Sequence, residues 1–175
     1  MFSTILVATD DSEHARKAVD LAADLAEKYQ ARLVLMHVVN PKQVSPDLRH
    51  MAEVEHLVQE RSPLHEGARP EVPTDWNLRL ASLRDNVDTN LKILNAVGQR
   101  LLDDIRQRIG SKVAQVDTRL EEGDAVDCIL DCAKAEQADL IVLGSRGLSE
   151  LKGLMMGSVS HKVSQLAECT CVTVK

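Results

Sequence analysis

Short apolar runs alternate along the chain with stretches in which apolar residues recur every three or four positions. Residues 4–8, 31–39 and 139–143 form the most apolar short runs. Unbroken runs of this kind are typical of strands buried on both faces of a parallel sheet. Residues 113–120 predict a further, less apolar strand, and residues 170–175 predict a final one. The pattern therefore predicts five strands.

Helical spacing marks the segments between these strands. Ser12 is a good N-cap residue for a helix that reaches about Tyr29. A long apolar stripe predicts a helix from about 76 to 109, in which Gly98 marks a kink or a close crossing. A third helix opens near Val126, after a turn at 121–124.

A last helix follows Gly157, with Ser158 placed to cap its first turn. Strands and helices thus alternate along most of the chain. This alternation predicts an α/β fold, a doubly wound parallel sheet of five strands with right-handed crossovers.

Residues 41–87 interrupt the alternation, and all five prolines of the chain fall within them. We interpret this segment as a helical and loop insertion within a single domain of residues 1–175. Apolar stripes over 48–58 and 76–87 are too regular for a disordered linker. We expect the insertion to be partly helical, and to pack on a partner subunit or over the mouth of a ligand site.

Glycines gather directly after the apolar run at 139–143: Gly144 and Gly147, and then, after nine intervening residues, Gly157. Glycine past the carboxyl end of a strand lets backbone N–H groups approach a ligand, and ligands of open α/β sheets bind at that end. The helix start after Gly157 adds a positive dipole end. We interpret the stretch as a phosphate cradle rather than as two plain turns, although it is neither a Walker A loop nor a dinucleotide fingerprint.

Polar candidates surround this cradle. Asp10, at the end of the first strand, is suited to accept from ribose hydroxyls or to help hold nucleotide-bound Mg²⁺, and a turn or cap role is an equal alternative. Arg146 offers a cation to phosphate. His37 has the setting of a partnered core residue rather than of a catalyst. Only Glu150 and His161 lie near the cradle as candidate general bases, which favours binding over efficient hydrolysis.

Charge and composition exclude some partners. The chain carries 21 basic and 27 acidic side chains, a net charge of −6, which argues against a nucleic acid or an anionic membrane as main partner. Neither a signal peptide nor an apolar run of the ~20 residues that a membrane span needs is visible, so we expect a cytoplasmic protein. The four cysteines lack Cys-x-x-Cys spacing, which favours reduced thiols over a metal or redox site.

These motifs together resemble the universal stress protein family, in its nucleotide-binding branch. The resemblance covers residues 1–40 and roughly 88–175, and rests on Asp10, on His37-Val38, and on Gly144-x-x-Gly147 followed by Gly157-Ser158. It implies a flavodoxin-like or Rossmann-like sheet of the adenine nucleotide alpha hydrolase type, with strand order 3-2-1-4-5. It also implies ATP binding, with Mg²⁺, and a homodimer formed through the last strand.

The resemblance further implies site residues. Its adenine and ribose contacts fall on Ala8, Asp10, Val38 and Leu143, and its phosphate contacts on Gly144, Arg146, Gly147, Gly157, Ser158, Val159 and Ser160. The chain departs from the family at Thr170-Cys171, where members often carry proline shortly before the final strand, and in the length of the 41–87 connector. We expect an ATP-binding regulatory or stress-response protein; a slow ATPase and a nucleotide-independent scaffold or chaperone-like protein are the alternatives.

Overall fold

A computed structural model describes residues 2–40, 76–148 and 156–175, with the side chains of all of these except 76–90. The predicted helix over 48–58 and Glu150 lie outside the described residues, as does most of the insertion. The elements are β1 (Thr4–Ala8), α1 (Glu13–Tyr29), β2 (Arg32–Val39), α3 (Trp76–Ile109), the 3-10 turn η2 (Gly110–Lys112), β3 (Val116–Glu122), α4 (Ala125–Ala135), β4 (Leu140–Gly144), α5 (Ser158–Leu166) and β5 (Thr170–Val174).

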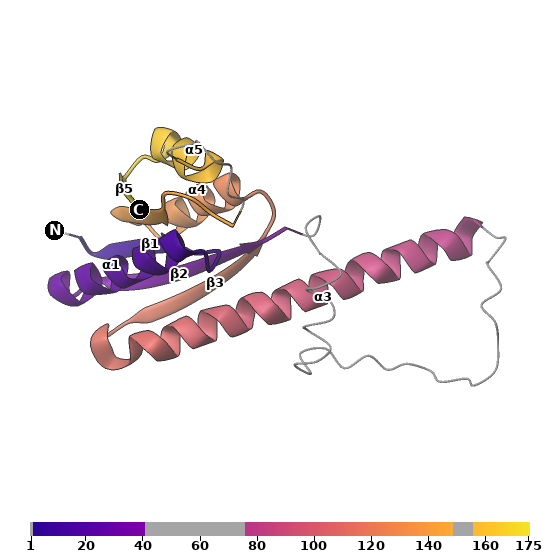
Figure 1. Cartoon of the computed structure of the whole chain (residues 1–175), viewed down its shortest axis with the longest axis horizontal. Helices are drawn as coiled ribbons and strands as arrows, with labels where there is room; N and C mark the ends of the chain where they lie inside the picture. The colour runs from indigo at the N-terminus through magenta and orange to yellow at the C-terminus, as the bar shows by residue number, and fades with distance from the viewer. Residues whose placement is uncertain (1, 41–75, 149–155) are drawn as a thin grey trace. The chain divides into compact units, whose positions relative to one another are not determined.

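The five strands form one parallel sheet in the order β3-β2-β1-β4-β5, which confirms the predicted fold class and the strand order that the resemblance implies (Figure 1). Ala8 of β1 pairs with Met36 of β2 on one side and with Leu143 of β4 on the other. Strands β2 and β3 follow β1 on one side of it in the sheet, whereas β4 and β5 lie on its other side. The carboxyl ends of β1 and β4 are therefore the switch point at which open α/β sheets bind ligands.

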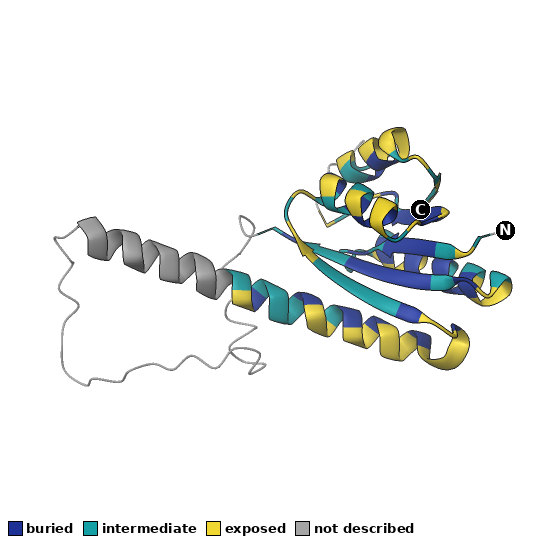
Figure 2. Cartoon of the chain, turned by 180° about the vertical axis from the view of Figure 1, so that it is seen from behind, coloured by how far each residue is buried: buried dark blue, intermediate teal, exposed yellow. Residues whose placement is uncertain are grey.

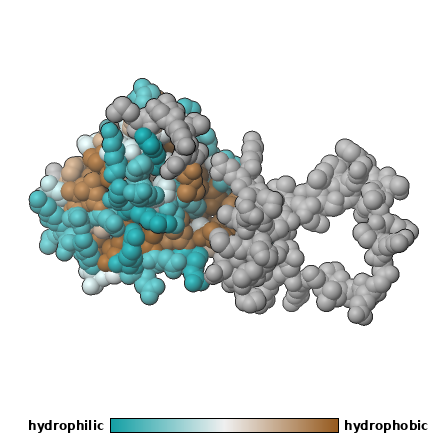
Figure 3. Space-filling view, in the orientation of Figure 1, coloured by the Kyte–Doolittle hydropathy of each residue, from teal (hydrophilic) through white to brown (hydrophobic). Residues whose placement is uncertain are grey.

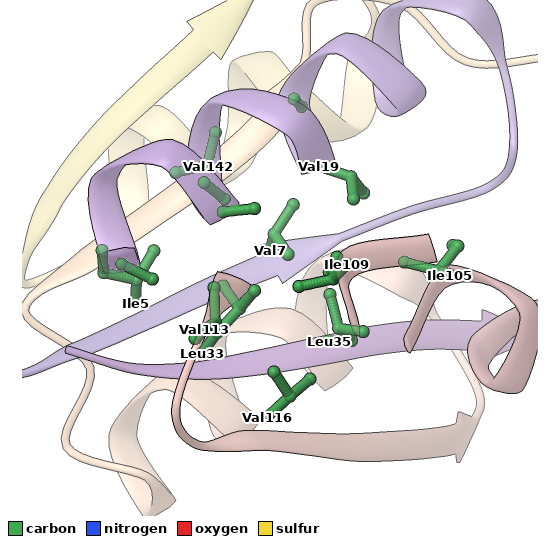
Figure 4. Packing of buried hydrophobic residues seen from close by; sticks show 14 of the residues in the cluster. Ile5, Val7, Val19, Leu33, Leu35, Ile105, Ile109, Val113, Val116 and Val142 are labelled. Carbon is green, nitrogen blue, oxygen red and sulfur yellow. The ribbon is translucent and has the colours of Figure 1, made fainter. Parts of the chain in front are cut away.

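Two compact units divide the chain, Met1–Asn40 with Gly98–Lys175, and Pro41–Val97, and the sheet belongs to the first. One face of this sheet packs against α1 and the C-terminal turns of α3. Alternate strand residues such as Val7 and Leu35 meet Val19 and Ile105 there (Figure 4). Leu102 is fully buried in the same cluster.

The other face packs against α4 and α5, which lie together on one side of the sheet (Figure 1). The alternate residues Leu6, Val34 and Ile141 meet Ile129 and Val163 there, and all five are buried. Figure 2 shows the resulting gradient, with buried central strands and exposed outer helix faces. Burial of strands on both faces explains their unbroken apolar runs.

Two predicted boundaries are wrong. The third strand begins at Val116 rather than at 113, because a 3-10 turn follows α3, and it continues through Glu122 into the predicted turn. The N-cap of α5 is Gly157 rather than Ser158, since Gly157 has extended backbone angles (φ −73°, ψ 158°) and Ser158 is already helical. Ser12, by contrast, caps α1 as predicted, accepting the N–H of Ala15 at 3.3 Å.

The long helix occurs where its stripe predicts it, and Gly98 marks a close crossing. A Cβ atom at Gly98 would lie 2.7 Å from Leu120 Cδ1 and 2.8 Å from His37 Cδ2. Both distances are shorter than van der Waals contact, so a side chain at position 98 would require Leu120 and His37 to shift.

Candidate functional site

Asp10 joins the loop after β1 to the glycine loop after β4. Its Oδ1 accepts the backbone N–H of Ser12 at 3.1 Å, and its Oδ2 accepts the backbone N–H of Leu148 at 3.0 Å. The hydroxyl of Ser12 donates to the carbonyl of Arg146 at 3.2 Å. The two loops that end the neighbouring strands β1 and β4 are therefore held together by hydrogen bonds.

Two of the three site glycines lie where other parts of the protein approach them closely. A Cβ atom at Gly144 would lie 2.7 Å from the backbone nitrogen of Ala15, because the end of β4 runs against the first turn of α1. A Cβ atom at Gly147 would lie 2.5 Å from Asp10 Oδ2. At these positions glycine allows the close approach of one part of the chain to another.

Gly157 differs from both. The nearest described atom to a Cβ atom there is the carbonyl oxygen of Ser145, at 3.4 Å, which is ordinary contact. Its φ of −73° suits any residue. Gly157 therefore has a backbone that another residue could adopt, in a space that holds a methyl group among the described residues.

The N-terminus of α5 supplies backbone donors. The first intrahelical bond runs from His161 N–H to the carbonyl of Gly157 at 3.0 Å, so the preceding N–H groups of Ser158, Val159 and Ser160 have no acceptor within the helix. The N–H of Gly157 itself donates to Ser145 at 2.7 Å. An anion at this helix end would thus meet the next three N–H groups rather than that of Gly157.

Ser160 is buried, and its hydroxyl donates to the carbonyl of Gly144 at 2.7 Å. This bond ties α5 to the end of β4. The hydroxyl proton is engaged within the protein, so a hydrogen bond from it to phosphate requires this contact to break. Ser158, in contrast, is exposed.

Apolar side chains gather beside these donors, at the carboxyl edge of the sheet. Ala8, Val38 and Leu143 come from the adjacent strands β1, β2 and β4, and all three belong to the cluster on the α4/α5 face or pack against it. Val159 of α5 packs against the same cluster. Since Ala8, Val38 and Val159 are only partly buried, the structure brings the residues predicted for a base together as a partly open apolar surface.

Arg146 is exposed on the glycine loop, and among the described residues no carboxylate lies within ion-pair distance of it. Asp11, next to Asp10, is instead bound by Arg16 through two hydrogen bonds of 2.9 and 2.8 Å. The bond to Arg16 holds the pKa of the Asp11 carboxyl below its usual value. Asp11 is thus a paired carboxylate, which leaves Asp10 as the acidic group that faces the glycine loop.

Sequence reasoning missed Leu148 and Arg16. Leu148 contributes a backbone N–H, which every residue other than proline carries, so no residue type could have indicated it. Arg16 meets Asp11 because the chain turns at Asp11 with φ of 63°. A positive φ at an aspartate has no signal in a single sequence beyond the turn preference of the residue.

The described residues hold no group of three or more His, Cys, Asp or Glu side chains that could bind a metal ion. All four cysteines are free thiols, and they belong to the cluster on the α4/α5 face or pack against it. Burial raises the pKa of Cys132 to about 11. Little of the Cys132 thiol is therefore ionised near neutral pH, and the residue acts as an apolar packing group.

On the face that Figure 3 shows, hydrophilic residues of the described part surround bands of hydrophobic ones. No helix within residues 2–40, 76–148 or 156–175 combines the length and the apolar character that would let it cross a membrane.

Comparison with known proteins places the chain in a family. It matches the sequence profile of the Universal stress protein family over residues 1–175. Universal stress protein YxiE of Bacillus subtilis is 34% identical over 177 aligned residues, which cover 100% of both proteins.

Solved structures share the fold. Universal stress protein UspA from Lactobacillus plantarum superposes with a TM-score of 0.68 at 22% identity, over 99% of this chain and 97% of that one. A universal stress protein in complex with cAMP superposes with a TM-score of 0.55 at 20% identity, over 99% and 96%. Because the family profile spans the whole sequence, this chain belongs to the universal stress protein family.

Proposed function

We propose that this protein binds an adenine nucleotide, ATP with Mg²⁺ in the first place, at the carboxyl ends of β1 and β4. Gly157 is the observation that carries the proposal. Close packing explains the glycines at 144 and 147, whereas the described residues leave room for a side chain at 157. Gly157 lies at the start of α5, whose first N–H groups have no acceptor within the helix. A phosphate seated on that helix end would need the close approach that glycine allows.

The rest of the site suits the other parts of a nucleotide. The partly open surface of Ala8, Val38 and Leu143 fits the flat face of a base. Asp10, already an acceptor of two N–H groups, has further lone pairs for ribose hydroxyls. Arg146, exposed on the loop, provides a cation for the phosphates.

Mg²⁺ fits this donor set. The ion is usually held by one or two carboxylates together with the phosphate oxygens of the ligand, and Asp10 provides one carboxylate at the edge of the cradle. When bound, Mg²⁺ would neutralise phosphate charge. Asp10 would then orient the ion, while the N–H groups of Ser158 and Val159 hold the phosphate oxygens.

The solved relative in complex with cAMP supports an adenine nucleotide as the ligand class. We infer a regulator rather than an efficient hydrolase, because His161, the general-base candidate that the structure describes, is an exposed side chain of α5. The nucleotide state would then alter binding to other proteins during stress.

We further propose a homodimer through β5. This strand pairs only with β4 within the described sheet, so its outer edge presents unpaired backbone groups. Proteins seldom leave such an edge bare, and a second copy would cover it.

Two measurements test the ligand. Mass spectrometry of the small molecules released from the purified protein should find an adenine nucleotide. Calorimetry with ATP, cAMP and GTP should then rank ATP first. The same titration with Gly157→Val should show ATP binding weakened by more than tenfold, about 1.4 kcal/mol, because the new side chain occupies the phosphate position.

Lys162→Val is the matched control, since it places the same side chain at an exposed position beyond the first turn of α5. Its affinity for ATP should equal that of the wild type. Unchanged affinity in the Gly157→Val protein would show that the phosphate assignment is wrong, and the nucleotide-independent scaffold would become the better reading.

A further inference from the structure

His37 connects β2 to the turn that carries Asp10. The regular pairing of β1 with β2 ends at Ala8 and Met36, and Thr9 N–H then donates to the carbonyl of Met36 at 2.9 Å. One residue further, His37 Nδ1 lies 2.7 Å from the carbonyl oxygen of Thr9. A carbonyl only accepts hydrogen bonds, so Nδ1 carries the proton, and a side chain continues the link between the two strands.

Thr9 is the anchored residue of this turn. It is 5% exposed, and three of its groups are bonded: the N–H to Met36, the carbonyl to His37, and Oγ1 to the N–H of Asp11 at 3.2 Å. Asp10 lies between the two residues that these bonds hold. The direction in which Asp10 points toward the glycine loop therefore depends on how Thr9 is held.

Helix α3 fixes the ring of His37 from the other side. The Cα atom of Gly98 approaches so closely that an added Cβ would lie 2.8 Å from His37 Cδ2. The same Cβ would lie 2.7 Å from Leu120 Cδ1 on β3. The imidazole thus sits between the backbone of α3 and the carbonyl of Thr9, with little freedom to turn away from either.

We propose that His37 is a positioning residue of the nucleotide site: its Nδ1–H holds Thr9 so that Asp10 faces the loop after β4, and Gly98 leaves the ring the space to do so. The effect on nucleotide affinity rests on the proposed function. The effect on the turn itself does not, and it is measurable in the free protein. We expect an effect on affinity and an effect on the turn, because the buried carbonyl of Thr9 loses its side-chain donor when His37 is replaced by a residue without one.

Two substitutions separate the donor from the bulk of the side chain. In His37→Asn the amide nitrogen occupies nearly the place of Nδ1 and donates a hydrogen bond. His37→Leu keeps comparable volume but has no donor. We expect ATP affinity to fall about tenfold in His37→Leu, the equivalent of one lost hydrogen bond, and to stay within about twofold of wild type in His37→Asn.

Amide hydrogen exchange in the free protein gives a readout that does not need nucleotide. The N–H groups of Asp11, Ser12 and Leu148 should exchange faster in His37→Leu and at the wild-type rate in His37→Asn. Imidazole ¹⁵N shifts of the wild type should show a protonated Nδ1. If wild-type protein binds no nucleotide, the proposed function fails, and the exchange comparison still decides the role of His37.

Gly98→Ala approaches the same ring from α3. The new methyl group should press on His37 and weaken ATP binding several-fold, although Gly98 is remote from the glycine loop in the sequence. In a His37→Ala background the ring is absent and only the contact with Leu120 remains, so Gly98→Ala should reduce affinity less than it does in the wild type, and this non-additivity identifies the ring as the link. The proposal is overturned if folded His37→Leu protein keeps both wild-type ATP affinity and wild-type exchange at Asp11 and Ser12.

Discussion

The carboxylate of Asp10 accepts the backbone N–H of Leu148 at 3.0 Å, although the two residues are 138 positions apart in the sequence. They meet because β1 and β4 are neighbours in the sheet, and each residue follows one of these strands. The other oxygen of Asp10 accepts the N–H of Ser12, which is a turn-forming bond. The turn role of Asp10 is thus confirmed, and its role as a ligand contact stays a prediction.

Asp10→Asn should weaken both the loop and the site. The amide keeps one acceptor oxygen, while its NH₂ group must face the N–H of Ser12 or of Leu148. We expect a loss of about 1 kcal/mol in the free energy of unfolding, measured with urea, together with weaker ATP binding. Asp131→Asn, at an exposed position of α4, is the control and should change neither quantity.

Two alanine substitutions should distinguish a packing glycine from a ligand glycine. Gly144→Ala pushes a methyl group into the backbone of His14 and Ala15, and should cost about 2 kcal/mol of stability. Gly157→Ala should leave the free energy of unfolding nearly unchanged and reduce ATP affinity. Equal losses of stability in the two proteins would show that Gly157, like Gly144, is needed for packing, and would contradict its assignment to the ligand.

Glu136 joins α4 to two strands and should make stability depend on pH. Its carboxylate contacts Arg32 of β2 at 2.6 Å and Arg119 of β3 at 2.6 Å. The hydrogen bond from Arg32, followed by that from Arg119, lowers the pKa of Glu136 below the ordinary value of 4.5. The ionised form is therefore favoured by folding, so its stabilisation is complete above pH 4.5 and is lost as the pH falls through the lowered pKa.

Glu136→Gln should accordingly reduce the free energy of unfolding at pH 7 by about 2 kcal/mol. The difference from wild type should shrink as the pH is lowered below 4.5, the ordinary pKa of the carboxyl. Urea titrations at several pH values measure both effects. Glu13→Gln, which breaks an exposed pair with Lys17 on α1, should have little effect at any pH.

Thr173→Pro should separate a dimer formed through β5. The carbonyl of Val174 accepts the N–H of Ser145, so the backbone groups of Val174 point toward β4. The N–H and C=O groups of consecutive strand residues point to opposite sides. The N–H of Thr173 therefore points to the open edge, and proline removes it without breaking the bond to β4. Sedimentation at micromolar concentration should show a dimer for wild type and Thr173→Val, and a monomer for Thr173→Pro. A monomeric wild type, with or without ATP, would contradict the dimer.

Cys132 should react slowly with thiol reagents. Burial raises its pKa to about 11, so little thiolate exists near neutral pH. Timed alkylation followed by mass spectrometry should modify Cys132 only on unfolding, and Cys128, partly exposed on the same helix, sooner. Equal labelling of Cys132 in native and denatured protein would show that the thiol is accessible.

The sequence by itself determined the elements and their class. Apolar runs and helical spacing are local properties. They predicted Ser12 as the N-cap of a helix reaching about Tyr29 and a long helix over 76–109, and the structure confirms both as α1 (Glu13–Tyr29) and α3 (Trp76–Ile109). The glycine pattern also led to the family, to which the whole chain belongs. Boundaries failed where local preference was overridden, as at Ser158, where the extended backbone of Gly157 takes the cap position.

Only the tertiary structure decided what the individual site residues do. Gly144 and Gly147 look alike in the sequence. In the structure, however, a side chain at Gly144 would clash with the backbone of α1, and one at Gly147 would clash with the carboxylate of Asp10. The contacts of Leu148 with Asp10 and of Gly98 with His37 join segments that are distant in the chain. Such contacts depend on which strands are neighbours and on how closely a helix crosses the sheet. Neither property produces a periodic pattern of apolar and polar residues that could be recognised in the sequence.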